Sequence, residues 1–162
     1  MAWLVLLALF LIVAFLWGAG TGAPWLPSHR LAVKRGLELL NLKPGQLLVD
    51  LGSGSGTVLL LAAQQGIRSI GYEISPVLWL WSWLRTRRYR RLVTIKFGNY
   101  WHQPLPVADG IYVFLMERFM PKLDQKLKSE LSRPTSVVSF GFKIGARPIV
   151  ERRFNVYLYR YP

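Results

Sequence analysis

The chain has no cysteine, only two histidines, and eight acidic residues against 21 lysines and arginines. Without cysteine the protein can form neither a disulfide bond nor a zinc-thiolate site. The histidines, His29 and His102, are too few for a convincing metal cluster. We therefore expect no metal site in this protein.

Charge is also missing from the N-terminal segment. Ala2 to Trp17 contains no charged or strongly polar side chain, and small residues continue the apolar stretch to Ala23. About 17 to 25 such residues span a bilayer. A cleaved signal peptide is the alternative. A signal peptide has a positively charged region before its apolar stretch, however, and no lysine or arginine precedes the stretch here. We predict a transmembrane anchor over residues 1–23, a linker and helix cap over 24–30, and a globular domain over 31–162.

The excess of basic residues lies entirely on one side of this segment. All lysines and arginines occur at or after Arg30, and the formal net charge is +13. The positive-inside bias therefore predicts a single-pass protein of the cell membrane with its globular domain in the cytoplasm. Nucleic acid and an anionic membrane surface are both partners for such a charge, and the predicted anchor favours the membrane.

The basic residues concentrate in Arg85 to Arg91, directly after Trp79, Trp81 and Trp83. Tryptophan beside arginine is typical of the lipid headgroup region, so this segment is expected to contact anionic lipid. An equally weighted alternative follows from helical packing. In that alternative the arginines form a solvated helix end, and the core contacts are Leu80, Trp83 and Leu84.

A glycine-rich segment, VDLGSGSG over Val49 to Gly56, gives the strongest indication of chemistry. Its first residues suit a buried strand that contains one charge, Asp50. The glycines, Gly52, Gly54 and Gly56, allow a tight turn and a close approach of the backbone to a ligand. A helix beginning at Thr57 then directs its free N–H groups at that ligand. Glu73, 23 residues after Asp50, can accept hydrogen bonds from a ribose.

The spacing of the glycines distinguishes between ligands. A dinucleotide site usually has G-x-G-x-x-G, whereas here the third glycine comes one residue early and Thr57 takes its place. Asp50 would sit poorly against a pyrophosphate but well beside a cationic aminoacyl group. The segment resembles the S-adenosylmethionine (SAM) motif of class I methyltransferases. A dinucleotide site, or a glycine-rich turn without a ligand, is the alternative.

Strands and helices alternate along the rest of the chain, which predicts an α/β, Rossmann-like fold. Its sheet should be mostly parallel, with one or more antiparallel C-terminal strands in the alternating segment from Pro148 to Tyr161. Strands are expected over residues 47–51, 68–73, 92–97, 110–116 and 136–142, and helices over 28–42, 57–65, 75 to the arginine cluster, and 121–131. The carboxyl ends of parallel strands meet at one edge of a sheet. That edge should hold Asp50, Glu73, Asn99 and Glu117.

Nearly all of the globular part resembles one family. This family comprises the membrane-anchored lysine methyltransferases that modify the ATP synthase c-subunit and the mitochondrial adenine nucleotide translocase, together with short prokaryotic relatives. The matching segments are Leu26–Ser28, Asp50–Gly56, Gly71–Pro76, Gly98–Trp101, Phe114–Met120 with Leu123 and Lys126-Leu127, and Val137–Phe140. The chain departs from the family pattern at Ser55, which is usually acidic, at Asn99, usually Asp, and at Met116-Glu117, where relatives tend to have proline.

The resemblance implies SAM as the cofactor and assigns roles to the residues of the matching segments. Asp50, Gly52 and Gly54 would hold the aminoacyl end, Glu73 the ribose, and Asn99 with Tyr100 the adenine. Ser53 and Gly56 belong to the same cofactor loop. Ser28 would touch the methionine carboxylate, and its alternative role is that of a helix cap.

Methyl transfer from a sulfonium needs positioning and desolvation rather than a metal or a nucleophilic side chain. The resemblance implies a protein lysine as acceptor, in a membrane-associated protein. Glu117 is the candidate for orienting or deprotonating the acceptor amine, and a solvated carboxylate is the alternative. A small-molecule or lipid methyltransferase is the second functional hypothesis, and a non-catalytic basic module that binds membrane or nucleic acid is the third.

Overall fold

The computed structural model describes residues 30–162 of the chain. The predicted anchor, and the linker as far as His29, lie outside this range, and so does Ser28. Within residues 30–162, no helix combines the length and the apolar character needed to cross a membrane.

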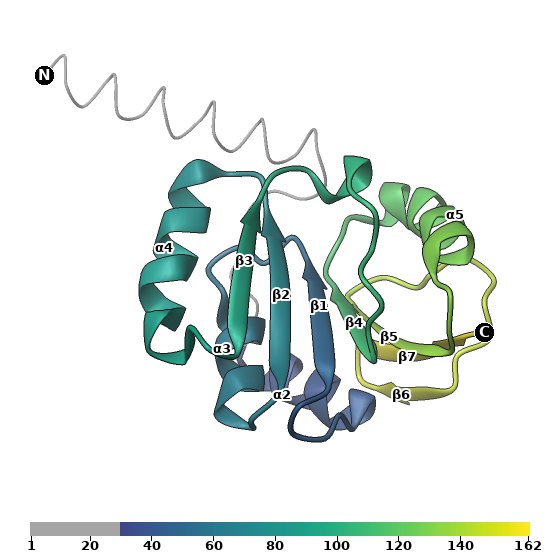
Figure 1. The fold of residues 1–162 in the computed structure, drawn as a ribbon. Coiled ribbons are helices and arrows are strands. Elements are labelled where there is room, and N and C mark those ends of the chain that lie inside the picture. Colours follow the sequence, from purple (N-terminus) through teal and green to yellow (C-terminus); the bar gives the residue numbers. More distant parts are fainter. Residues whose placement is uncertain (1–29) are drawn as a thin grey trace, which may run out of the picture.

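A seven-stranded sheet forms the centre of the molecule, in the order β3-β2-β1-β4-β5-β7-β6 (Figure 1). The strands are β1 (Leu47–Leu51), β2 (Arg68–Glu73), β3 (Val93–Phe97), β4 (Gly110–Val113), β5 (Thr135–Phe140), β6 (Glu151–Arg153) and β7 (Val156–Tyr161). The first five strands pair in parallel, and β7 runs antiparallel to both β5 and β6. The strand order reverses between β1 and β4, which is where open α/β sheets bind their ligands.

Within residues 30–162, four α-helices cover the sheet: α2 (Arg30–Leu40), α3 (Thr57–Gln64), α4 (Pro76–Thr86) and α5 (Met120–Glu130). Short 3₁₀ turns add η1 (Arg87–Tyr89), η2 (Tyr100–His102) and η3 (Glu117–Phe119). α2, α3 and α4 pack side by side against one face, with α2 over β5 and β7 and α4 at the outer edge over β3. α5 covers the other face, near β4 and β5 (Figure 1).

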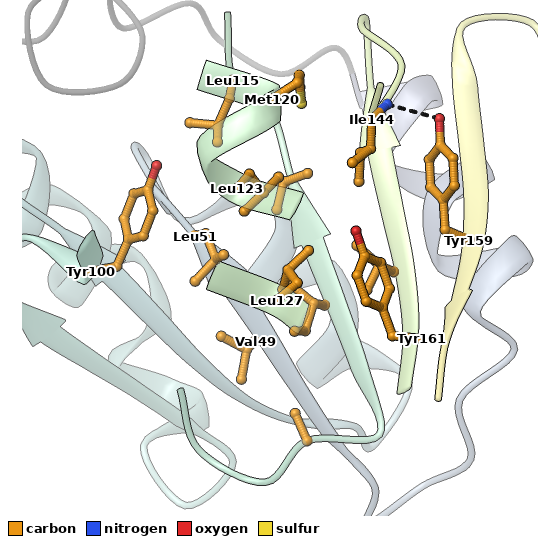
Figure 2. Close-up of a cluster of buried hydrophobic side chains, with 14 of the residues drawn as sticks. Val49, Leu51, Tyr100, Leu115, Met120, Leu123, Leu127, Ile144, Tyr159 and Tyr161 are labelled. Carbon is orange, nitrogen blue, oxygen red and sulfur yellow. Dashed lines mark hydrogen bonds between the residues drawn. The ribbon is translucent and has the colours of Figure 1, made fainter. Parts of the chain in front are cut away.

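Alternating residues of the central strands supply the two larger core clusters of residues 30–162, one on each face of the sheet. Leu48 and Tyr112 face α2 and α3, whereas Val49, Leu51 and Ile111 face the other way. The second cluster is completed by Met120, Leu123 and Leu127 of α5 and by tyrosines of β7, as Figure 2 shows. In the same cluster Tyr159 accepts a hydrogen bond from the backbone N–H of Ile144 at 3.0 Å.

The predicted fold class is confirmed for the described residues, and β1 and β2 have the predicted bounds. One expectation about burial was wrong. The alternative in which the tryptophan-rich helix packs into the core named Leu80, Trp83 and Leu84 as its core contacts, and all three side chains are exposed. The fourth strand ends at Val113 rather than at Met116, since the chain leaves the sheet toward η3.

Candidate functional site: a glycine loop between two acidic residues

The four predicted polar residues all lie at the carboxyl edge of the parallel strands. Asp50 is the last residue but one of β1, and Glu73 is the last residue of β2. Asn99 follows β3 by two residues, and Glu117 begins η3 beyond β4. β1 and β2 are neighbours in the sheet, so the carboxylates of Asp50 and Glu73 are close together. The charge of Glu73 contributes to raising the pKa of Asp50.

The glycine loop turns tightly against the neighbouring strand. The backbone N–H groups of Gly52 and Ser53 both donate to the carbonyl oxygen of Tyr72, at 3.1 and 2.8 Å. Gly52 has φ 94° and Gly56, the N-cap of α3, has φ 74°, so both occupy the region that favours glycine. An added Cβ at Gly52 would meet no atom within 4 Å, which leaves open space beside the loop.

Glu73 fastens this loop to the end of β2. Its Oε2 accepts a hydrogen bond from the N–H of Gly54 at 2.7 Å, and its Oε1 accepts one from Ser75 at 2.8 Å. Burial raises the pKa of this carboxyl above its usual value, and the backbone donors work in the opposite direction. Each oxygen has a second lone pair, so the carboxylate can also accept bonds from ribose hydroxyls.

Asp50 is the least satisfied acidic group of the site. Its side chain is only 3% exposed, and Oδ2 is buried without a hydrogen-bond partner. Burial, and next the charge of Glu73, raise its pKa to about 8. A buried carboxyl without a partner is costly unless a cationic ligand completes it.

These features fit the aminoacyl end of SAM. The unpartnered Asp50 Oδ2 can receive an ammonium group, and Ser53 Oγ is a second buried oxygen without a partner. The open space at Gly52 lies beside the same loop. An orphaned acceptor, a free hydroxyl and space for a ligand therefore occur together.

The sequence did not identify the support that α4 gives this loop. Arg85 donates from Nη1 to the carbonyl oxygen of Ser55 at 2.6 Å and reaches Thr57 Oγ1 at 3.5 Å. Ser82 packs so closely against Gly56 that a Cβ at position 56 would collide with the Oγ of Ser82. Arg85 thus has a contact inside the fold that the predicted lipid contact of Arg85 to Arg91 did not include. Nothing in the sequence separates it from the arginines that follow.

Asn99 and Tyr100, the predicted adenine contacts, are only partly available. Asn99 Oδ1 caps η2 by accepting the N–H of Trp101 at 3.0 Å, which leaves its amide nitrogen for other partners. Tyr100 is buried at the margin of the core cluster in Figure 2, and its hydroxyl has no partner. Burial raises the pKa of this phenol, so it remains a neutral donor.

The remaining candidates lie at the surface. Glu117 is exposed in the first turn of η3, and His102 is exposed at the end of η2. No cluster of three potential metal-binding side chains occurs between residues 30 and 162.

A glycine loop between acidic residues at the ends of β1 and β2, in a sheet with this strand order, is typical of class I methyltransferases. Residues 50–151 match the family described as the ANTKMT methyltransferase domain, so the chain belongs to this family of SAM-dependent methyltransferases. The predicted resemblance is confirmed.

Curated relatives have similar sequences. An ATP synthase c-subunit lysine N-methyltransferase of Xenopus laevis is 30% identical over 74% of this chain and 53% of its own length. The adenine nucleotide translocase lysine N-methyltransferase of Mus musculus is 33% identical over 75% and 54%. The chain thus spans about half the length of these relatives. A protein-lysine N-methyltransferase of Saccharolobus islandicus is 26% identical over 75% of this chain and 78% of its own.

A solved structure has the same fold over most of the chain. It is an RNA methyltransferase from Salinibacter ruber in complex with S-adenosylhomocysteine, with TM-score 0.76 and 28% identity. The similarity covers 84% of this chain and 92% of that one. A SAM-dependent methyltransferase from Geobacter sulfurreducens, also bound to S-adenosylhomocysteine, shares the fold at TM-score 0.59 and 22% identity.

Proposed function

We propose that this protein transfers a methyl group from SAM to the ε-amino group of a lysine in a membrane-associated protein. The family supports methyl transfer, and the names of the curated relatives support a lysine acceptor. The observation that carries the proposal is the buried, unpartnered Oδ2 of Asp50 beside the loop that Glu73 holds.

The residues of the site would hold SAM by complementary charge and by the loop backbone. Asp50 would bind the methionine ammonium and release its own proton as the cation approaches, since a nearby positive charge lowers the pKa of a carboxyl. Glu73 would accept the ribose hydroxyls while it keeps the loop in place, and Asn99 would bond the adenine. SAM supplies an activated methyl group on a sulfonium, so the protein has to orient the donor and exclude water.

The acceptor lysine must lose a proton before it can attack the methyl group. Glu117 follows β4 at the same edge of the sheet as Asp50 and Glu73, and its side chain is exposed to solvent. It would orient the amine, or accept its proton, and transfer that proton to solvent. This role is separate from SAM binding, so substitution of Glu117 should spare cofactor affinity.

A location at the inner face of the cell membrane completes the proposal. The apolar sequence before Ala23 and the restriction of basic residues to positions from Arg30 onward support a single anchor with the methyltransferase domain in the cytoplasm. Two of the relatives are named for acceptors that belong to membranes, an ATP synthase component and a translocase. A tethered enzyme would meet such acceptors by lateral diffusion.

RNA methylation is the second candidate function. It is favoured by the similarity to the Salinibacter ruber RNA methyltransferase and by the net charge of +13. The names of the curated relatives favour lysine instead, and we retain lysine as the main proposal.

Two experiments test the proposal. Calorimetric titration with S-adenosylhomocysteine, in buffers of different ionisation enthalpy, should show binding with proton release that disappears in Asp50→Asn. A folded protein without affinity would disprove the cofactor assignment. Membranes incubated with methyl-labelled SAM should then incorporate label into protein, at N-methyl-lysine; label in RNA or in lipid would replace the lysine proposal by the corresponding alternative.

A further inference from the structure

The helix α4 has its polar side buried and its apolar side exposed. Its two buried residues are Ser82 and Thr86. Leu78 and Trp79 are half-buried, whereas the other large apolar side chains are exposed, including Val77 at 55% and Trp81 at 53%. The exposed apolar residues are Val77, Leu80, Trp81, Trp83 and Leu84. Four of them follow the spacing i, i+3, i+4, i+7 and so share one face of the helix.

Specific contacts fix this orientation. Ser82 is small enough to lie against Gly56, where a larger side chain would collide with the glycine loop. Thr86 Oγ1 donates to the carbonyl oxygen of Ser82 at 2.9 Å, and Trp79 Nε1 donates to that of Ile95 in β3 at 3.1 Å. The apolar face therefore cannot turn inward without breaking the packing that supports the loop.

A basic segment continues directly from this face. Arg87, Arg88, Arg90 and Arg91 are all exposed, and the ion pairs found between residues 30 and 162 involve none of the four. The sequence contains no acidic residue between Glu73 and Asp109. The positive charge at this end of α4 is therefore not neutralised locally.

We infer that this face lies on the surface of an anionic lipid bilayer. The α4 surface consists of Val77, Leu80, Trp81, Trp83 and Leu84, together with Arg87, Arg88, Arg90 and Arg91. Aliphatic and tryptophan side chains enter the boundary between headgroups and acyl chains, and the arginines bind lipid phosphates. Helix α4 lies parallel to the membrane plane in this arrangement.

Charge and composition select lipid over other occupants. A second copy of the chain would bring two such arginine clusters close together on molecules that each carry +13, and like charges oppose this association. The phosphates of a nucleic acid would bind the arginines, but its polar backbone would then lie against the aliphatic side chains of Val77, Leu80 and Leu84, which is unfavourable. A bilayer with anionic headgroups complements both the apolar side chains and the arginines of the α4 surface.

The same helix holds the cofactor loop, because Arg85 donates to Ser55 on the inner side of α4. Docking of α4 would therefore place the glycine loop one helix layer from the lipid. The inference needs neither the predicted N-terminal anchor nor a particular methyl acceptor, so it can fail or succeed independently of the proposed function.

The absence of cysteine permits a direct test with the full chain. Leu80→Cys places a single fluorophore on the α4 surface, and Leu84→Cys is the second position should the first variant fold poorly. The matched control is Val150→Cys, which is 57% exposed next to β6 at the opposite edge of the sheet. Each protein is mixed with vesicles of phosphatidylcholine, alone or with phosphatidylglycerol, that carry a doxyl-lipid quencher.

We expect quenching at position 80 to rise about threefold or more when phosphatidylglycerol is present, because each arginine near the surface adds to the attraction. Quenching at position 150 should stay low on both vesicles. Replacement of Arg87, Arg88, Arg90 and Arg91 by glutamine should lower the quenching at position 80 to the level measured with phosphatidylcholine alone. Circular dichroism and thermal unfolding establish that each variant is folded.

Four other results would overturn the inference. Absence of quenching at position 80 would exclude lipid contact, and equal quenching on both vesicles would exclude a role for the arginines. If the fluorophore is shielded in the absence of vesicles, and if this shielding increases with protein concentration, the surface binds a second copy of the chain. Concentration-independent shielding would assign it to the N-terminal segment of the same chain.

Discussion

Arg85 in α4 donates a hydrogen bond of 2.6 Å to the carbonyl oxygen of Ser55, thirty residues earlier in the chain. On the other side of the loop, Glu73 accepts the N–H of Gly54 at 2.7 Å. The glycine loop is thus held from both sides by charged side chains of elements that follow it. Its geometry therefore depends on residues outside the glycine motif.

Arg85→Gln should weaken the binding of S-adenosylhomocysteine about five- to thirtyfold. Loss of a hydrogen bond from a charged donor costs on the order of 1 to 2 kcal/mol, here at the loop that holds the ligand. Calorimetry measures the affinity. Arg91→Gln removes the same charge from the exposed end of the cluster and should leave affinity unchanged; an equal loss in both variants would indicate a general charge effect instead.

Gly52→Ala should impair cofactor binding far more than stability. The φ of 94° strains an alanine by roughly 1 to 2 kcal/mol, and the added methyl group would occupy the space beside the loop. Gly45→Ala is a matched control, since Gly45 also has a positive φ, 86°, and no atom within 4 Å of an added Cβ. Thermal unfolding should show similar losses for the two variants.

Only Gly52→Ala should lose affinity for S-adenosylhomocysteine, by about tenfold or more. This difference would place a ligand contact at Gly52, since the backbone strain is common to both variants. Comparable affinities would mean that the space beside Gly52 is not used by the ligand.

Asp50 should make stability fall as pH rises. Its pKa is about 8 in the folded chain against 3.8 for the ordinary carboxyl, so between these values the folded state holds a proton that the unfolded state has released. The stabilisation is complete below pH 3.8 and is lost as pH rises through about 8. Each unit of pKa difference corresponds to about 1.4 kcal/mol of unfolding free energy.

Denaturant titrations of ligand-free protein from pH 4 upward measure this trend against Asp50→Asn, which cannot ionise. The variant should have the flatter profile and the higher stability above neutral pH, because it removes a buried charge that has no partner. Parallel profiles for the two proteins would show that Asp50 does not titrate in this range.

Glu117→Gln should lower kcat on the protein acceptor by about a hundredfold, which is typical for loss of a general base. Affinity for S-adenosylhomocysteine should not change, since Glu117 lies outside the glycine loop. Glu38→Gln, on the exposed outer side of α2, is the control and should keep its activity. An unchanged rate across pH for Glu117→Gln would remove this residue from the mechanism.

Local patterns predicted the sheet edge and its residues well. The run from Leu47 to Leu51 ends in glycines, and Ser75-Pro76 gives a cap followed by the first helical residue, as observed. Such signals depend only on residues that are close in the sequence, so they can be recognised without knowledge of the tertiary structure. The orientation of α4 could not be predicted, because residues 77–84 are almost uniformly apolar and have no helical periodicity.

The order of strands and helices, the glycine loop, and the position of Asp50 and Glu73 at one edge of a parallel sheet follow from the residues alone. The buried side of α4, and the difference between Arg85, bound to Ser55, and the exposed arginines after it, become visible only in the folded molecule. Adjacent arginines are chemically identical, so packing determines which of them reaches an acceptor and which remains in solvent.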